Sequence, residues 1–170
     1  EKNPDLSLET QHDIAEMVAI GAIKYPMISR ENTKIVTFDW DSALDFNGQS
    51  APYIQYACVR ANSILKRGAV TDTHAQTSFD YELEPAEVNL IEHISRLPQE
   101  LAKAAKDYKP SLIATYAYDL AKAFNDFYNQ CPVLNTEAKI KAARLALTSA
   151  ARITIENSLH LLGIKAPQVM

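Results

Sequence analysis

Tyrosine and arginine residues alternate along one short stretch of this 170-residue chain, at the spacing of a single helix face. Projected at about 100° per residue, they share one arc, whose members are Tyr53, Tyr56, Arg60, Ser63 and Arg67. Tyrosine rings offer flat faces on which unpaired bases stack, and guanidinium groups between them can meet phosphates or base edges. The spacing therefore favours a surface for single-stranded nucleic acid along about 20 Å of helix.

The same spacing also has a purely structural interpretation. A tyrosine at the margin of a core buries its ring and exposes its hydroxyl, and the arginines beside it are then merely solvated. The adjoining arc is apolar and is expected to be core; its members are Ile54, Ala57, Cys58, Ala61, Ile64 and Leu65. Spacing alone does not choose between the two interpretations.

Charge is unevenly distributed along the chain, although the formal net charge is only -4. Residues 46–71 carry three basic and no acidic side chains, and residues 139–170 carry five basic and one acidic. The remaining two blocks, 1–45 and 72–138, are acidic. Because local potential governs polyanion binding more than the total charge does, the two basic windows can form a positive patch. The alternative is that such short charge biases arise by chance.

Motifs for catalysis are missing from the sequence. The four glycines form no phosphate-binding loop, and the four histidines, His12, His74, His93 and His160, stand singly. No zinc signature is present, and the two cysteines are far apart, which favours a reducing, cytoplasmic setting. No apolar run approaches the about 18 residues of a membrane span. We therefore expect no catalytic residue, cofactor site, metal site or membrane contact in this chain.

Helix dominates the expected fold, an all-α bundle with a short extended segment at 34–38 and a loop at 69–82. The expected helices are 8–28, 52–67, 85–97, 98–108, 110–129 and 136–162. Ser7, Ser50 and Thr136 are suited to cap helix starts, and Gly68 and Gly163 to follow helix ends. Short connections between such helices favour antiparallel packing.

Several ordered blocks resemble one family, the class I arginyl-tRNA synthetases. The runs at 38–41, 46–60 and 63–65 (Phe-Asp-Trp-Asp, then Phe-Asn-Gly-Gln-Ser-Ala-Pro-Tyr-Ile-Gln-Tyr-Ala-Cys-Val-Arg, then Ser-Ile-Leu) resemble the segment where the catalytic core of these enzymes meets the anticodon-binding domain. Residues 18–25 resemble a helix upstream of it, 116–134 the helix that names the anticodon-binding module with the turn after it, and 161–170 the closing residues. The resemblance covers nearly the whole chain.

The resemblance implies that this chain is one part of a longer parent enzyme, whose catalytic motifs lie outside it. Enzymes of the family ligate arginine to tRNA with ATP and Mg2+, through His-Ile-Gly-His-like and Lys-Met-Ser-Lys-Ser-like motifs that do not occur here. The chain, which begins without Met, is thus expected to be a C-terminal fragment that is inactive alone. Residues 1–46 would be a helical connector following the catalytic domain, and 47–170 the anticodon-binding bundle. The expected partners are the anticodon stem-loop of tRNA-Arg and the catalytic domain of the parent chain.

The resemblance also implies roles for individual residues. Tyr53, Tyr56 and Arg60 match positions that lie against the anticodon loop, Tyr128 matches a tyrosine near the same loop, and Met170 matches a C-terminal residue that reaches the flipped bases. Arg67 is added from the helical projection alone, and Phe124 and Phe127 are expected in the core.

Two other functions are compatible with the same sequence. A helical protein–protein interaction module would bury the tyrosine and arginine arc against a partner protein. The anticodon-binding module of a related class I synthetase would bind a different tRNA. For Tyr128 and Met170 the structural alternatives are a half-buried bundle tyrosine and a frayed tail.

Overall fold

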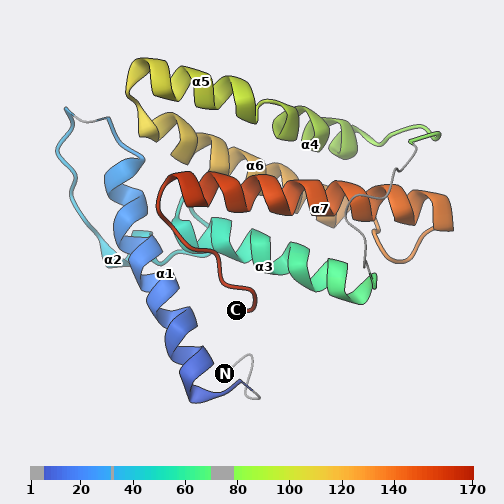
Figure 1. The fold of residues 1–170 in the computed structure, drawn as a ribbon, viewed down its shortest axis with the longest axis horizontal. Helices are drawn as coiled ribbons and strands as arrows, with labels where there is room; N and C mark the ends of the chain where they lie inside the picture. The colour runs from blue at the N-terminus through green and yellow to red at the C-terminus, as the bar shows by residue number, and fades with distance from the viewer. Residues whose placement is uncertain (1–5, 32, 70–78) are drawn as a thin grey trace.

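The structure is a computed structural model, and it describes residues 6–31, 33–69 and 79–170. Within these residues the fold is entirely α-helical and contains no strand, which confirms the predicted class (Figure 1). The helices are α1 (Leu8–Ile28), α2 (Trp40–Ala43), α3 (Ala51–Arg67), α4 (Pro85–Ser95), α5 (Leu97–Asp107), α6 (Pro110–Gln130) and α7 (Ala138–Leu161). None of the described helices is long and apolar enough to cross a membrane.

Helix starts follow the predicted capping chemistry at two of three positions. The Ser7 hydroxyl accepts a hydrogen bond from the Thr10 backbone N–H, and the Ser50 hydroxyl accepts one from that of Tyr53, each at 3.2 Å. Thr136 was predicted to cap the last helix, and this is wrong. The N-cap is Glu137, because the chain stays extended through that residue (φ -55°, ψ 145°) and helical backbone begins only at Ala138.

The connecting segments are not helical where they can be compared with the predictions. Residues 35–38 lie outside any helix and form no strand. The predicted loop at 69–82 falls largely outside the described residues, and its ends at Ala69 and at 79–82 are not helical.

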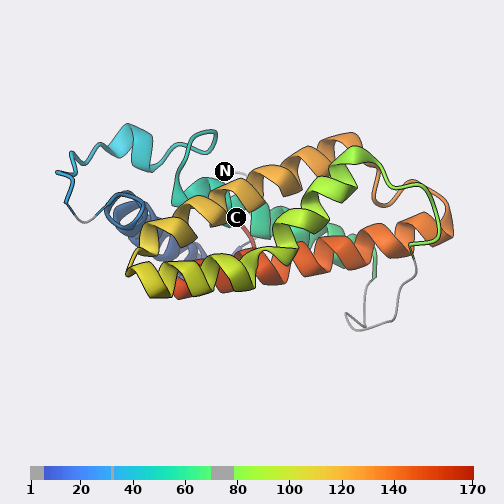
Figure 2. The same cartoon turned by 90° about the horizontal axis from the view of Figure 1, so that it is seen from above.

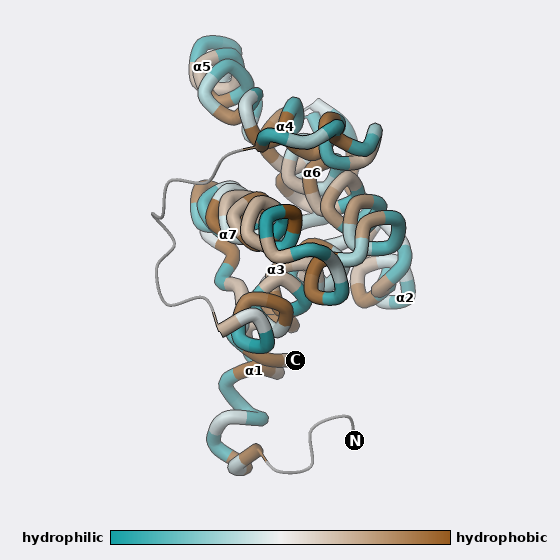
Figure 3. The backbone as a smooth tube through the Cα atoms, turned by 90° about the vertical axis from the view of Figure 1, so that its right-hand side faces the viewer, coloured by the Kyte–Doolittle hydropathy of each residue, from teal (hydrophilic) through white to brown (hydrophobic). Residues whose placement is uncertain are grey.

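Three helices form the centre of the bundle. Helix α3 packs against both α6 and α7, which also pack against each other, while α4 and α5 cover α6 on the side away from α3 (Figure 2). Helix α1 packs across α3, and seen from the end of the bundle it lies on the side opposite α5 (Figure 3). Phe124 and Phe127 are fully buried at this centre, as predicted. The apolar face of α3 is buried too, including Ile54, Ala57 and Cys58.

The C-terminal tail after α7 returns along α3 and is tied there by a buried side chain. The amide Nε2 of Gln55 donates to the Lys165 carbonyl at 2.7 Å and to the Met17 carbonyl of α1 at 3.1 Å. Farther along, the Asn62 amide donates to the Gln168 side chain at 3.2 Å. These contacts place the last residue, Met170, beside the exposed face of α3 (Figure 1).

Gly163 makes the turn from α7 into this tail, with φ at +66°. A side chain in that left-handed region is strained, and an added Cβ would lie 3.1 Å from Lys24 Nζ, whose ammonium donates to the Gly163 carbonyl. We therefore expect Gly163→Ala to lower the free energy of unfolding by about 1 kcal/mol in urea denaturation. Gly163→Asn should lose less, because asparagine tolerates this conformation better, and equal losses would contradict a conformational cause.

Candidate nucleic-acid interface

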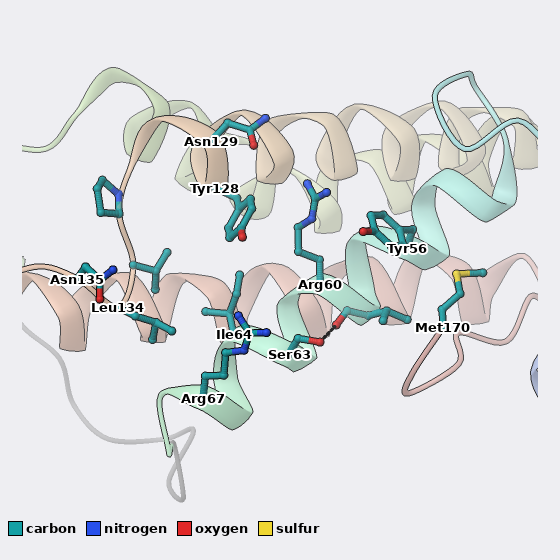
Figure 4. Close-up of a pocket in the computed structure, with 13 residues that line it drawn as sticks. Tyr56, Arg60, Ser63, Ile64, Arg67, Tyr128, Asn129, Leu134, Asn135 and Met170 are labelled. Atoms are coloured by element: carbon teal, nitrogen blue, oxygen red, sulfur yellow. Dashed lines mark hydrogen bonds between the residues drawn. The ribbon is translucent and has the colours of Figure 1, made fainter. Parts of the chain in front are cut away.

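The predicted arc of α3 faces a groove between α3, the end of α6 and the turn after it (Figure 4). The groove has a volume of about 640 Å³. Its lining includes five of the six residues that the sequence singled out for nucleic-acid binding: Tyr56, Arg60, Arg67, Tyr128 and Met170. Residues from α3, α6 and the C-terminal tail, far apart in sequence, thus meet at one surface.

The sixth residue, Tyr53, lies in an adjacent groove of about 720 Å³ that shares Tyr56, Arg60 and Met170 with the first. Its ring is half-buried, packs against the core, and lies 5.3 Å from the Tyr118 ring at a tilt of 45°. Tyr53 therefore combines the two predicted roles, because part of the ring supports the bundle and part borders the groove.

Arg60 lies between two aromatic rings. Its guanidinium carbon is 5.0 Å from the centre of the Tyr56 ring, one helical turn away on α3, and 4.9 Å from that of Tyr128 on α6. Such cation–π contacts hold a planar cation against ring faces. The sequence predicted cations between rings along one helix; the structure places the ring on the far side of Arg60 on a different helix.

The remaining predicted residues border the first groove in different ways. Arg67, in the last turn of α3, is exposed. The Ser63 hydroxyl donates to the Val59 carbonyl within its own helix, at 3.0 Å. Met170 lines both grooves because the tail is held along α3.

Several other groove residues were not singled out from the sequence, among them Phe46, Asn125 and Asn129. Phe46 lies edge-on to Tyr56, with ring centres 6.3 Å apart, and lines the second groove. Asn125 and Asn129 of α6 line this groove as well, and Asn129 also lines the first. Asn125 and Tyr128 are three residues apart and so share one helix face, a signal that the sequence offered.

Ion pairs with other segments neutralise two cations of the basic window at residues 139–170. Arg144 is buried and pairs with Glu87 of α4, while Arg152 and Lys139 pair with Glu156 and Asp80. Arg144 is thus lost to the interior and Lys139 pairs at the surface, while Arg152 pairs with Glu156, the one acidic residue already counted in this window. The positive patch at this window is therefore weaker than its charge count predicted. Arg60 and Arg67 supply the positive charge that lines the first groove.

Arg144 also fixes the wall of the groove. Its Nη1 donates to the Pro132 carbonyl at 3.0 Å, in the turn whose residues 132–135 line the first groove. Its Nε and Nη2 donate to the two carboxylate oxygens of Glu87, which has no solvent exposure. Burial alone would raise the pKa of Glu87, but hydrogen bonds from Arg144, Tyr81 and the Glu84 backbone outweigh burial and lower it.

Metal-ligating side chains are not clustered in the described residues, where no group of three or more His, Cys, Asp or Glu could hold a metal ion. Burial raises the pKa of the Cys58 thiol to about 12, so this cysteine is protonated and packs as an apolar side chain.

Comparisons with known proteins identify the family to which this helical bundle belongs. The family model described as the DALR anticodon binding domain matches residues 54–170. The chain belongs to this family of helical anticodon-binding domains.

Its relatives include arginine–tRNA ligases. An arginine–tRNA ligase of Haloarcula marismortui is 45% identical over 167 residues, covering 98% of this chain and 28% of the relative. One of Pyrococcus abyssi is 44% identical over 173 residues, covering 100% of this chain and 28% of the relative. The chain thus spans well under a third of the length of these proteins, and it matches their C-terminal part.

A solved structure agrees with the sequence relatives. The arginyl-tRNA synthetase of Thermus thermophilus superposes with a TM-score of 0.91 at 34% identity, over 100% of this chain and 29% of the other. The resemblance to arginyl-tRNA synthetases that the sequence blocks indicated is confirmed.

Proposed function

We propose that this chain recognises the anticodon loop of tRNA-Arg as the C-terminal part of an arginine–tRNA ligase. The observation that carries the proposal is the Tyr56–Arg60–Tyr128 stack, which lines the first groove of a domain in an anticodon-binding family. The parent enzyme would ligate arginine to this tRNA in the cytoplasm with ATP and Mg2+. The ligation chemistry would belong to the part of the parent that carries the catalytic motifs.

The grooves suit unstacked nucleotides rather than a duplex. Bases splayed out of a loop can stack on the exposed parts of Tyr56, Tyr128 and Phe46, while Arg60 and Arg67 meet phosphates or base edges. Because the facing sides of the Tyr56 and Tyr128 rings are covered by Arg60, bases would use the sides turned to the grooves. We place Tyr53 and Met170 at the borders of the bound loop.

Binding of RNA stem-loops tests this function. We expect a stem-loop with an arginine anticodon to bind in a salt-dependent manner and more tightly than one with a substituted anticodon. If this surface binds a partner protein and not RNA, the stem-loops should show no salt-dependent binding. A preference for the anticodon of another amino acid would point to a related class I synthetase.

Tyr56→Ala is expected to weaken RNA binding much more than it weakens the fold. Loss of one base–aromatic stacking contact costs about 1–3 kcal/mol, which raises Kd by about 5- to 150-fold. The half-buried ring has no hydrogen bond in the described structure, so the free energy of unfolding should fall by only about 1 kcal/mol. Fluorescence anisotropy with labelled RNA and urea denaturation measure the two quantities.

Tyr108→Ala is the matched control, because Tyr108 is 84% exposed at the end of α5 and lines neither groove. It should leave RNA affinity unchanged. A loss of stability in Tyr56→Ala as large as its loss of RNA affinity would favour the purely structural interpretation of the α3 tyrosines.

A further inference from the structure

The guanidinium of Arg60 is held by a side chain that has no role in the function proposed above. The Asn125 Oδ1 atom, on α6, accepts a hydrogen bond from Arg60 Nη1 at 2.8 Å. Tyr56 and Arg60 are four residues apart on α3, and Asn125 and Tyr128 are three apart on α6, so each helix presents its pair on one face. We call these four side chains the Arg60 clamp.

The two rings and the amide constrain Arg60 in different ways. The rings, 5.0 and 4.9 Å from the guanidinium carbon, restrict motion toward either ring. Attraction to a ring face is an interaction with its quadrupole and selects no particular N–H group. The hydrogen bond to Asn125 does select one, and it therefore fixes how the guanidinium is rotated.

Four of the five N–H groups of Arg60 remain for other partners. Among the described residues, Asn125 is the one side chain for which a hydrogen bond from this guanidinium is found. The remaining N–H edge therefore has one orientation and lies where both grooves meet. A fork of this kind binds two acceptor atoms at once, as on a phosphate or on a base edge.

We propose that Asn125 is a positioning residue for RNA recognition, which fixes the rotation of Arg60 so that its free N–H edge meets a pair of acceptor atoms on the RNA. The proposal rests on the function proposed above. Asn125 acts through Arg60 and need not touch the RNA itself.

The first test needs no RNA. The Arg60 Nε–H resonance in a 1H–15N spectrum of the chain should be displaced by the two neighbouring rings, and Arg60→Ala assigns it. We expect Asn125→Leu, which keeps the size but removes the acceptor, to move this resonance while the melting temperature changes by only a few degrees. Asn125→Asp keeps an acceptor at the same place and should retain the displaced resonance.

Asn89→Leu is the matched control, because Asn89 is exposed on α4 and lines neither groove. It should leave the Arg60 resonance unchanged. Asn125→Ala serves the same purpose if leucine impairs folding. An unchanged Arg60 resonance in both Asn125→Leu and Asn125→Ala would overturn the proposal.

The second test is a double-mutant cycle with an arginine-anticodon stem-loop. We expect Asn125→Leu to raise Kd about tenfold, and to raise it no further in the Arg60→Ala background. An equal rise in both backgrounds would show direct contact between Asn125 and RNA, and would overturn the positioning role. A loss that persists with substituted anticodons indicates a phosphate as the acceptor pair, whereas a loss confined to one anticodon indicates a base edge.

Failure of this inference and failure of the proposed function are distinguishable. If Arg60→Ala weakens RNA binding but neither Asn125→Leu nor Asn125→Ala does, only the positioning role is overturned. If Arg60→Ala itself leaves RNA affinity unchanged, the groove is not the RNA site and both proposals are overturned.

Discussion

Arg144→Met is expected to lower the free energy of unfolding by about 3–5 kcal/mol, because it leaves a buried carboxylate without its charged partner. Glu87 has no solvent exposure, and Arg144 donates to both of its carboxylate oxygens, at 2.9 and 3.3 Å. Methionine retains much of the aliphatic volume, so the loss reports mainly on charge and hydrogen bonds. Urea denaturation followed by circular dichroism measures it.

Arg152→Met is the matched control for this prediction. Arg152 also pairs with a glutamate, Glu156, at 2.7 Å, but both side chains are partly exposed. Its loss should cost less than about 1 kcal/mol. Adding Glu87→Gln to Arg144→Met should restore part of the stability, because it removes the stranded charge. Similar small losses for Arg144→Met and Arg152→Met would contradict the structural importance assigned to the buried pair.

The same pair predicts a pH dependence with a definite sign. The pKa of Glu87 is lowered in the folded state, so its ionised form adds stability that is present above its ordinary pKa of 4.5 and is lost as pH falls through the folded value. In Arg144→Met the carboxyl has lost that partner, so protonation relieves the buried charge. We therefore expect the stability difference between the two proteins to shrink as pH falls. It should begin to shrink above pH 4.5, where the stranded carboxyl of the variant takes up a proton, and continue below 4.5, where the original chain loses the stability of its ionised Glu87. Urea denaturation across pH measures this difference.

Arg144 contributes both to the stability of the fold and to the shape of the first groove. Its third contact holds the Pro132 carbonyl in the turn that forms one wall of the first groove. The buried pair of Arg144 and Glu87 adds no charge to the groove, but it shapes the surface at which Arg60 and Arg67 act. Variants of Arg144 should be compared in RNA binding only at temperatures where they are folded.

Arg60→Ala is expected to raise Kd for an arginine-anticodon stem-loop by about 10- to 150-fold, since hydrogen bonds to a charged group contribute about 1.5–3 kcal/mol. If the RNA acceptor is a phosphate, the salt dependence of log K should also become less steep, by about 0.7–0.9. Titrations at several salt concentrations measure both effects.

Arg60→Lys separates charge from geometry. Lysine keeps the charge, so the salt dependence should stay close to that of the original chain, but it lacks the planar fork that lies between Tyr56 and Tyr128. Its affinity should therefore fall between those of the original chain and Arg60→Ala. Lys106→Ala, on α5 and outside both grooves, is the control for a nonspecific loss of charge. Equal effects of Arg60→Ala and Lys106→Ala would contradict a specific contact.

Much of the helical architecture was predictable from the sequence, because its signals are local. The Ser50 cap and the apolar arc of Ile54, Ala57 and Cys58 predicted where α3 begins and which face is buried. The ordered sequence blocks identified the family without any coordinates, and Phe124 and Phe127 are core residues as expected. The cap predicted at Thr136 was wrong because the start of α7 depends on the conformation of the turn before it.

The arrangement of the site depended on contacts between distant segments. Helical spacing brings Tyr56 and Arg60 together, but only the packing of α3 against α6 places Asn125 and Tyr128 on the other side of the guanidinium. Charge counts along the sequence likewise treated Arg144 as a surface cation, whereas folding places it against Glu87 in the interior. Local residue types and spacing therefore determined the helices and the candidate residues. Tertiary packing decided which cations remain at the surface and what holds them, because those contacts join residues more than 50 positions apart.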